Sequence, residues 1–113
     1  MVGDPTAPAR GDLVWISLNL QAGHEQAGRR PALVISPKEY NERVGLALMC
    51  PITNRVKGYP FEVALPDDIE IAGVVLADQI RSLDWRARRA EVTATAPATL
   101  TAEVLGKLNV LLS

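Results

Sequence analysis

Short stretches with the alternating pattern of β-strands follow one another closely along this chain, and their spacing constrains the fold more than any other feature. The stretches cover residues 11–18, 31–36, 44–53, 59–65, 72–77 and 79–83. Parallel strands need crossover connections of about a dozen residues or more, and most of these gaps are shorter than that. The pattern therefore predicts a curled antiparallel sheet in a small α+β fold, with a small β-sandwich as the alternative.

Helical signals are sparse. Residues 37–43 allow one or two helical turns, and the end of the chain carries apolar residues at spacings typical of one amphipathic helix: Leu100, Val104, Leu105, Leu108, Leu111 and Leu112. Pro97 suits the first turn of this helix, and Thr95 is a candidate N-cap. The sequence thus predicts one short helix and one C-terminal helix.

Four residues in or near the predicted strands carry specific expectations. The stretch over residues 11–18 is apolar on both faces, so Trp15 is expected to be buried, and for Trp85, as for Trp15, a place in the core or at a dimer interface is favoured over contact with RNA. Pro51 lacks a backbone N–H and is expected at an edge strand or a bulge. Cys50 lies in an apolar run, which favours a small core residue over a nucleophile.

Composition excludes several classes of protein. With 113 residues, one domain is expected over residues 11–113, preceded by a flexible arm over residues 1–10. The net charge of −1 argues against binding driven by bulk positive charge. One cysteine and one histidine form neither a disulfide nor a Cys/His zinc site, whereas carboxylate-bound magnesium remains open. With no signal peptide and no long apolar run, we expect a cytoplasmic protein with no membrane partner.

A polar loop framed by two glycines holds the densest group of reactive side chains. Within seven positions it contains His24, Glu25, Gln26, Arg29 and Arg30. Imidazole transfers protons near neutral pH, and guanidinium groups bind phosphate oxygens, so the set is typical of acid–base chemistry on a phosphate. The alternative is a solvated loop in which Glu25 pairs with Arg29 or Arg30.

Two further groups of charged residues stand out. Arg81, Arg86, Arg88 and Arg89 lie within nine residues around Trp85, a combination that suits single-stranded RNA, although a solvated face is an equal alternative. A hydroxyl and two cations follow one another at the end of a predicted strand: Thr53, Arg55 and Lys57. They would face the same site as the glycine-framed loop if this strand end lies next to that loop. Asp12 and Asp78 flank strands, either as structural caps or as carboxylates of a site.

The strings GDLVW (residues 11–15), AGHEQAGRRPALVISP (22–37), KGYPFEV (57–63) and GVVLADQIRSLDWRAR (73–88) resemble the MazF/PemK family of toxin endoribonucleases, and its MazF branch in particular. This resemblance covers nearly the whole chain. It implies a small SH3-like β-barrel with a short helix and a C-terminal helix. It further implies a homodimer that cleaves single-stranded RNA at short sequence motifs, with no metal and no cofactor.

The resemblance also assigns roles to residues. Arg30 and Thr53 correspond to the catalytic arginine and threonine, Glu25 is a site carboxylate, and Glu25 or His24 would take the proton of the ribose 2′-hydroxyl. The Kid/PemK branch additionally uses an arginine and an aspartate two residues apart, where this chain has Leu76 and Asp78, so the base stays open between His24, Glu25 and Asp78. The residues expected to bind RNA are Gln26, Arg29, Arg55, Lys57, Gln79, Arg81 and Arg86.

An antitoxin whose acidic, disordered tail covers the RNA groove is the partner that the resemblance implies, and cleavage of mRNA would arrest translation and growth. Two other functions remain as alternatives. One is a non-enzymatic toxin of the gyrase-poison type, which acts by protein–protein contact. The other is a catalytically silent RNA-binding domain, which would tolerate alanine at Arg30 and Thr53.

Overall fold

The computed structural model describes residues 6–17 and 28–113 of the chain. In this part the elements, in chain order, are β1 (Asp12–Ser17), β2 (Arg29–Val34), α2 (Lys38–Val44), β3 (Ala47–Thr53), β4 (Glu62–Ala64), β5 (Val74–Leu76), the 3-10 turn η1 (Ala77–Gln79), β6 (Arg81–Leu83), β7 (Glu91–Thr95) and α3 (Ala98–Leu112). Both predicted helices are confirmed. None of the described helices is long and apolar enough to cross a membrane.

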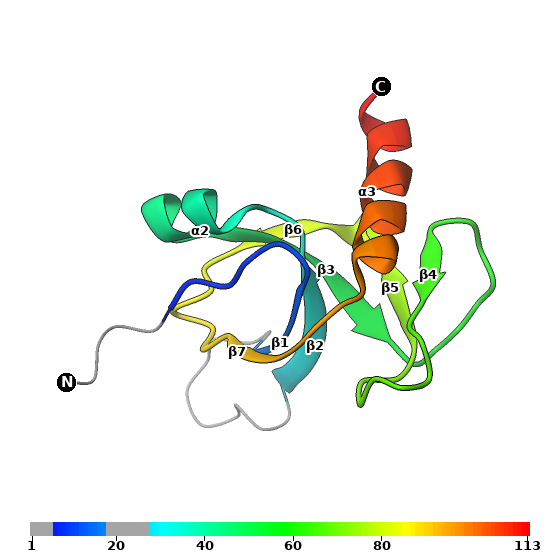
Figure 1. The fold of residues 1–113 in the computed structure, drawn as a ribbon, viewed down its shortest axis with the longest axis horizontal. Coiled ribbons are helices and arrows are strands. Elements are labelled where there is room, and N and C mark those ends of the chain that lie inside the picture. Colours follow the sequence, from blue (N-terminus) through cyan, green and yellow to red (C-terminus); the bar gives the residue numbers. More distant parts are fainter. Residues whose placement is uncertain (1–5, 18–27) are drawn as a thin grey trace.

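All seven described strands belong to one antiparallel sheet. Its order is β4-β5-β3-β2-β1-β7, and β6 pairs with β3 beside this path. The end strands β4 and β7 do not pair with each other, so the sheet curls without closing into a complete barrel (Figure 1). The predicted α+β fold around a curled antiparallel sheet is confirmed, and the alternative of a two-sheet sandwich is wrong.

Pro51 lies inside this sheet, on its central strand β3, and not at an edge or a bulge. It stands opposite Ala32 of β2 on one side. On the other side β3 pairs with β6 as far as Met49 and with β5 from Ile52 onward. Pro51 therefore occupies the break between two partner strands, where a missing N–H costs no regular ladder bond.

Apolar side chains fill two core clusters, one on each face of the sheet, because successive strand residues point to opposite faces. The first cluster contains Leu13, Leu33, Cys50 and Val75, and the buried residues of α3 pack against it: Leu100, Val104 and Leu108. The second cluster contains Val14, Ile16, Ala32, Val34, Met49 and Trp85. Helices α2 and α3 lie toward opposite ends of the sheet (Figure 1).

Strand β7 was not predicted, and it changes the expected start of the last helix. Its residues Glu91–Thr95 are mostly exposed, so no apolar alternation marks them, and pairing with β1 is what makes them a strand. Thr95 belongs to this strand. The N-cap of α3 is Pro97, without a side-chain hydrogen bond, so the predicted Thr95 cap is wrong.

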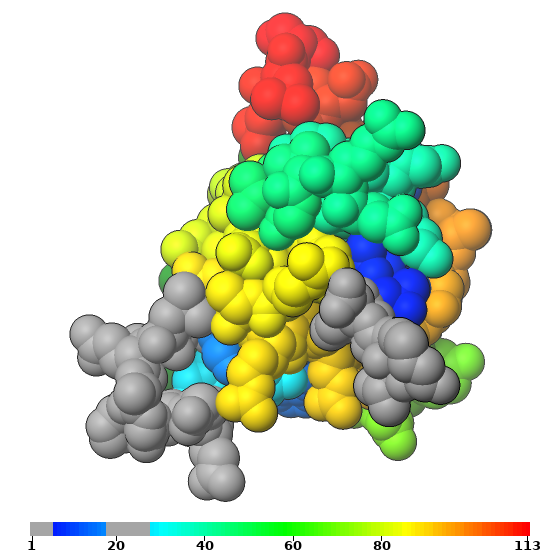
Figure 2. All heavy atoms as spheres, turned by 90° about the vertical axis from the view of Figure 1, so that its left-hand side faces the viewer, coloured from blue at the N-terminus to red at the C-terminus, as the bar shows by residue number. Residues whose placement is uncertain are grey.

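The described part of the N-terminal arm, residues 6–10, packs against the domain. Ala7 and Pro8 are buried. The side chain of Asn41 donates a 2.8 Å hydrogen bond to the carbonyl of Pro8, and Nε of Arg10 donates one of 2.6 Å to the carbonyl of Ile35. Figure 2 shows this blue segment against the green surface of α2. The arm therefore completes the second core cluster.

Candidate catalytic groove

A depression lined by several predicted site residues lies where β2 and β3 part. The pairing of these strands runs from Val34–Met49 to Ala32–Pro51 and leaves Arg30 and Thr53 beyond it. The depression has a volume of about 570 Å³ and is lined by Trp15, Arg29, Arg30, Pro31, Pro51, Ile52, Thr53, Asn54, Arg55 and Ala72. It brings the start of one strand and the end of another, 23 positions apart in sequence, into one site.

Two smaller depressions adjoin it and share its lining. One, of about 160 Å³, contains Thr53, Arg55, Lys57, Tyr59, Glu62, Leu76 and Gln79. The other, of about 180 Å³, contains Ile16, Arg30, Pro31, Ala32, Met49, Pro51, Gln79, Arg81 and Leu83. Because Thr53 and Arg30 each line two of the three depressions and Gln79 lines the two smaller ones, we treat them together as the basic groove.

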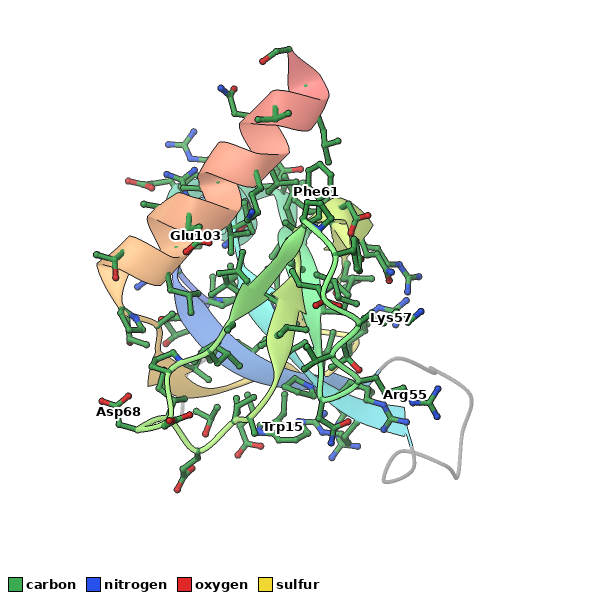
Figure 3. All side chains as sticks on the ribbon, turned by 90° about the vertical axis from the view of Figure 1, so that its right-hand side faces the viewer. Trp15, Arg55, Lys57, Phe61, Asp68 and Glu103 are labelled. Atoms are coloured by element: carbon green, nitrogen blue, oxygen red, sulfur yellow. The ribbon has the colours of Figure 1, made fainter. Side chains whose placement is uncertain are left out.

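The basic groove collects most of the described residues that the sequence indicated as functional. Arg30, Thr53, Arg55 and Lys57 all line it, as do Gln79 and Arg81. Figure 3 shows Arg55 and Lys57 on the same side of the molecule, along the segment that follows β3. The condition that the strand end bearing Thr53 meets the segment bearing Arg30 is thus fulfilled.

Arg30 offers its guanidinium at the surface of this groove. The residue is exposed, and its Nη1 donates a 2.9 Å hydrogen bond to the carbonyl of Arg29. A guanidinium carries a positive charge and presents paired N–H donors that match phosphate oxygens. Arg30 can therefore stabilise negative charge that develops on a phosphate in the groove.

Thr53 ends β3 with its hydroxyl in a defined orientation. Its Oγ1 accepts a 3.1 Å hydrogen bond from the backbone N–H of Arg55, which leaves the hydroxyl proton available to a ligand. Gly73, at φ +122°, packs against this strand end: a Cβ there would lie 2.2 Å from the carbonyl oxygen of Thr53. Only glycine allows this close approach, so Gly73 fixes the position of Thr53.

Arg29 differs from Arg30 in what its guanidinium contacts. Nη1 donates to the hydroxyl of Ser17 at 3.1 Å and to the carbonyl of Arg89 at 3.0 Å, and Nη2 donates to the carbonyl of Trp15 at 3.1 Å. Nη2 also lies 3.6 Å from the carboxylate of Glu91. These contacts tie β2 to β1 and to the start of β7, so Arg29 supports the groove from within the protein.

Two carboxylates near the groove are engaged by neighbouring donors. Glu62 accepts hydrogen bonds from the backbone N–H groups of Lys57, at 2.9 Å, and Gly58, at 2.8 Å, which fixes the loop that carries Lys57. Asp78 accepts a 2.9 Å hydrogen bond from the hydroxyl of Tyr59, and this bond raises the pKa of the Tyr59 phenol. Asp12, by contrast, caps a turn by accepting from the N–H of Ala9 at 2.8 Å.

The two tryptophans have different environments. Trp85 is buried, as expected, and its Nε1 donates a 2.8 Å hydrogen bond to the carbonyl of Asn41. Trp15 is 36% exposed and lines the groove, so its expected place in the core is wrong. The alternation that predicted burial does not reveal that one face of β1 opens onto a depression at this position.

Three other predictions have different outcomes. Cys50 is confirmed as a core residue, and burial, with a smaller effect of the Asp78 charge, raises its pKa to about 12. Arg86 lies over the ring of Trp85, 4.8 Å from its centroid, and does not line the groove. His24, Glu25 and Gln26 lie outside the described residues.

Among the described residues that line the groove, cations outnumber free carboxylates. Arg30, Arg55, Lys57 and Arg81 contribute positive charge, while the carboxylate of Glu62 is occupied by backbone N–H donors. Within residues 6–17 and 28–113, no three His, Cys, Asp or Glu side chains are grouped so that they could hold a metal ion. The net charge of the chain is −1, so the positive charge is local to the groove. This local charge suits an extended anionic ligand.

Known proteins are similar to this chain in sequence and in structure. Endoribonuclease toxin MazF of Escherichia coli K12 is 46% identical over 105 residues, which cover 93% of this chain and 94% of that protein. Endoribonuclease toxin ChpB of the same strain is 37% identical and covers 88% and 90%. The relatives thus match the chain over nearly its full length.

Solved structures agree with these relatives. MazF (Form-I) from Deinococcus radiodurans has a TM-score of 0.84 and 61% identity, over 94% of this chain and 96% of that one. A MazE–MazF structure (Form-II) from the same organism has a TM-score of 0.85 and 55% identity, over 95% and 96%. Residues 9–112 match the family described as PemK-like, MazF-like toxin of type II toxin–antitoxin system. The chain therefore belongs to this family of toxins.

Proposed function

We propose that the chain is an endoribonuclease toxin that cleaves single-stranded RNA at short sequence motifs, with the basic groove as its active site. The observation that carries the proposal is the meeting of Arg30 and Thr53 in one depression lined by further cations. The relatives named endoribonuclease, matched over nearly the whole chain, support the same activity. A gyrase poison would have no use for a guanidinium and a hydroxyl placed together in a basic groove.

The proposed reaction is an internal transesterification. The ribose 2′-oxygen forms a bond to the adjacent phosphorus, the bond from phosphorus to the 5′-oxygen breaks, and the products are a 2′,3′-cyclic phosphate and a 5′-hydroxyl. The nucleophile belongs to the substrate, so the step requires no metal-activated water. One proton leaves the 2′-hydroxyl and one reaches the departing 5′-oxygen, so the step calls for a general base and a general acid.

Arg30 and Thr53 would act on the phosphate in this step. The guanidinium of Arg30 stabilises the extra negative charge of the five-coordinate transition state and can supply the proton to the 5′-oxygen. The hydroxyl of Thr53 donates a hydrogen bond to a phosphate oxygen. His24, Glu25 and Asp78 are the candidates for the base that accepts the 2′-hydroxyl proton.

The other polar and charged side chains of the groove would bind RNA on either side of the scissile phosphate. Arg55, Lys57, Gln79 and Arg81 line the groove and have side chains that reach phosphates or base edges. Gln26 is proposed on the basis of the family resemblance alone. For Arg29 and Arg86 the contacts with protein groups favour a supporting role over direct RNA contact.

We further propose that the chain acts as a homodimer under the control of a cognate antitoxin. One chain of the MazE–MazF structure from Deinococcus radiodurans matches 95% of this chain, and that structure contains the toxin together with its antitoxin. The last turn of α3 leaves Val110, Leu111 and Leu112 exposed, an apolar end that a second copy would cover. An antitoxin with an acidic, disordered tail would occupy the basic groove and block RNA, and its loss would release cleavage of mRNA and arrest growth.

Incubation of the purified protein with a long single-stranded RNA in EDTA tests the proposal. Wild-type protein is expected to produce discrete fragments with 5′-hydroxyl and 2′,3′-cyclic phosphate ends. Arg30→Ala and Thr53→Val are expected to lose cleavage, whereas Arg43→Ala, on the exposed part of α2, serves as the matched control and retains it. Absence of cleavage by folded wild-type protein, or full activity of Arg30→Ala, would refute the proposal.

A further inference from the structure

Trp15 is a large apolar residue at a partly exposed position of β1. The stability of the fold does not require a tryptophan at such a position. Its neighbours in β1, Val14 and Ile16, are 0% and 1% exposed, whereas Trp15 is 36% exposed. The other tryptophan, Trp85, is 2% exposed and uses its indole N–H inside the core. The comparison separates a structural tryptophan from one whose ring meets solvent.

The backbone that carries Trp15 is held on both sides. The residue pairs with Pro31 of β2 and with Glu91 of β7, and its carbonyl accepts the 3.1 Å hydrogen bond from Nη2 of Arg29. A ring on such a support needs little ordering when a ligand binds, and this lowers the entropic cost of binding. Trp15 is therefore preorganised for contact.

The ring borders the same depression as the proposed catalytic pair. Trp15, Arg30 and Thr53 all line the cavity of about 570 Å³, and Figure 3 places Trp15 and Arg55 at the same end of the molecule. Aromatic planes next to guanidinium groups bind single-stranded nucleic acid, since each base has a face that stacks and each phosphate has a charge that pairs. A small metabolite site would be more enclosed and more apolar than this cavity.

We propose that Trp15 is a stacking platform for one nucleobase next to the scissile phosphate. The inference rests on the proposed function, because it takes RNA as the ligand of the groove. Stacking on Trp15 holds the base out of line with its neighbours, and this orients the sugar–phosphate between Arg30 and Thr53. Trp15 thus contributes to binding and positioning, and it takes no part in proton transfer.

Intrinsic fluorescence tests this contact separately from catalysis. The probe is a single-stranded DNA oligonucleotide with the sequence cleaved as RNA, which lacks the 2′-hydroxyl and stays intact; if no RNA is cleaved, the four DNA homopolymers replace it. Stacking is expected to quench the emission of wild-type protein. In Trp15→Phe only the buried Trp85 emits, and binding is expected to leave that emission unchanged. Single abasic substitutions along the oligonucleotide are expected to remove the quenching at one position.

Affinity measured by the anisotropy of a labelled oligonucleotide provides the second readout. Trp15→Leu removes the aromatic plane and is expected to raise Kd by about 5- to 150-fold, the range that corresponds to the loss of one stacked base. Trp15→Phe keeps a plane and is expected to retain most of the affinity. Val92→Ala, at an exposed apolar residue of β7 outside the groove lining, is the matched control with unchanged Kd.

The outcomes separate the two proposals. Quenching together with weakened binding by Trp15→Leu supports the platform even if no RNA is cleaved, and in that case only the proposed reaction fails. The platform is refuted if wild-type protein binds without quenching and Trp15→Leu has an unchanged Kd. In that case a positive cleavage assay still supports the proposed reaction. If wild-type protein binds none of these oligonucleotides, the platform is refuted as well.

Discussion

At the scale of single residues, two adjacent arginines perform different tasks. The guanidinium of Arg29 donates to Ser17, Trp15 and Arg89, whereas that of Arg30 faces the groove. We expect Arg29→Ala to lower the free energy of unfolding by about 1–3 kcal/mol, because charged donors stabilise the acceptors that they satisfy. Arg30→Ala should lower it less, while cleavage falls by about 10²- to 10³-fold. Equal losses of stability in urea titrations at one protein concentration would contradict this division.

The thiol of Cys50 provides a second prediction at this scale. Burial raises its pKa from 9.0 to about 12, so the thiol stays protonated at pH 8–9 and is shielded from reagents. A disulfide reagent such as DTNB is expected to react slowly with native protein and rapidly in denaturing urea. Since the folded state keeps a proton that the unfolded chain releases, this group also lowers stability as pH rises from 9 to 12. Equal reaction rates in the native and unfolded protein would show that the thiol is accessible.

At the scale of elements, the end of β3 depends on the segment before β5. We expect Gly73→Ala to reduce cleavage strongly, since the new Cβ would lie 2.2 Å from the carbonyl oxygen of Thr53 and must displace that strand end. Gly45→Ala is the matched control: it also has a positive φ, of +81°, but nothing lies within 4 Å of the added Cβ. Both variants carry the strain of a left-handed conformation, of about 1 kcal/mol, and kcat/KM is the measurement. Equal activity of the two variants would exclude Gly73 from positioning Thr53.

The elements also show what the sequence can predict and why the rest escapes it. The strands with apolar alternation and both helices follow from local pattern, since burial decides their periodicity. Strand β7 escapes because its residues are mostly exposed and only the pairing with β1 defines it. The expected positions of Trp15 and Pro51 are wrong for the same reason. Segments that are distant in sequence determine where the sheet opens beside Trp15 and where β3 changes its partner strand at Pro51. The meeting of Arg30 with Thr53 likewise depends on how far β2 and β3 pair.

At the scale of the whole molecule, the exposed apolar end of α3 is the surface that we propose a second copy of the chain covers. Val110 is 68% exposed and Leu112 is 83% exposed. We expect Val110→Asp combined with Leu112→Asp to convert a dimer into a monomer, because charges oppose the burial of this surface in an interface. Sedimentation velocity measures the change, and Val44→Asp, at a 51% exposed residue of α2, is the control that stays dimeric. A dimer that survives the double substitution would place the interface elsewhere.

We propose that the groove between β2 and β3 directs the substrate's own 2′-hydroxyl at the phosphate. The most direct test is an RNA oligonucleotide that carries the mapped cleavage site and a single 2′-deoxy substitution at the nucleotide preceding the scissile phosphate. Wild-type protein is expected to bind this oligonucleotide and leave it intact, while the matched RNA with the deoxy nucleotide several positions away is cut normally. Cleavage of the first oligonucleotide at the same phosphate would rule out the 2′-hydroxyl as the nucleophile, since another group would then perform the reaction.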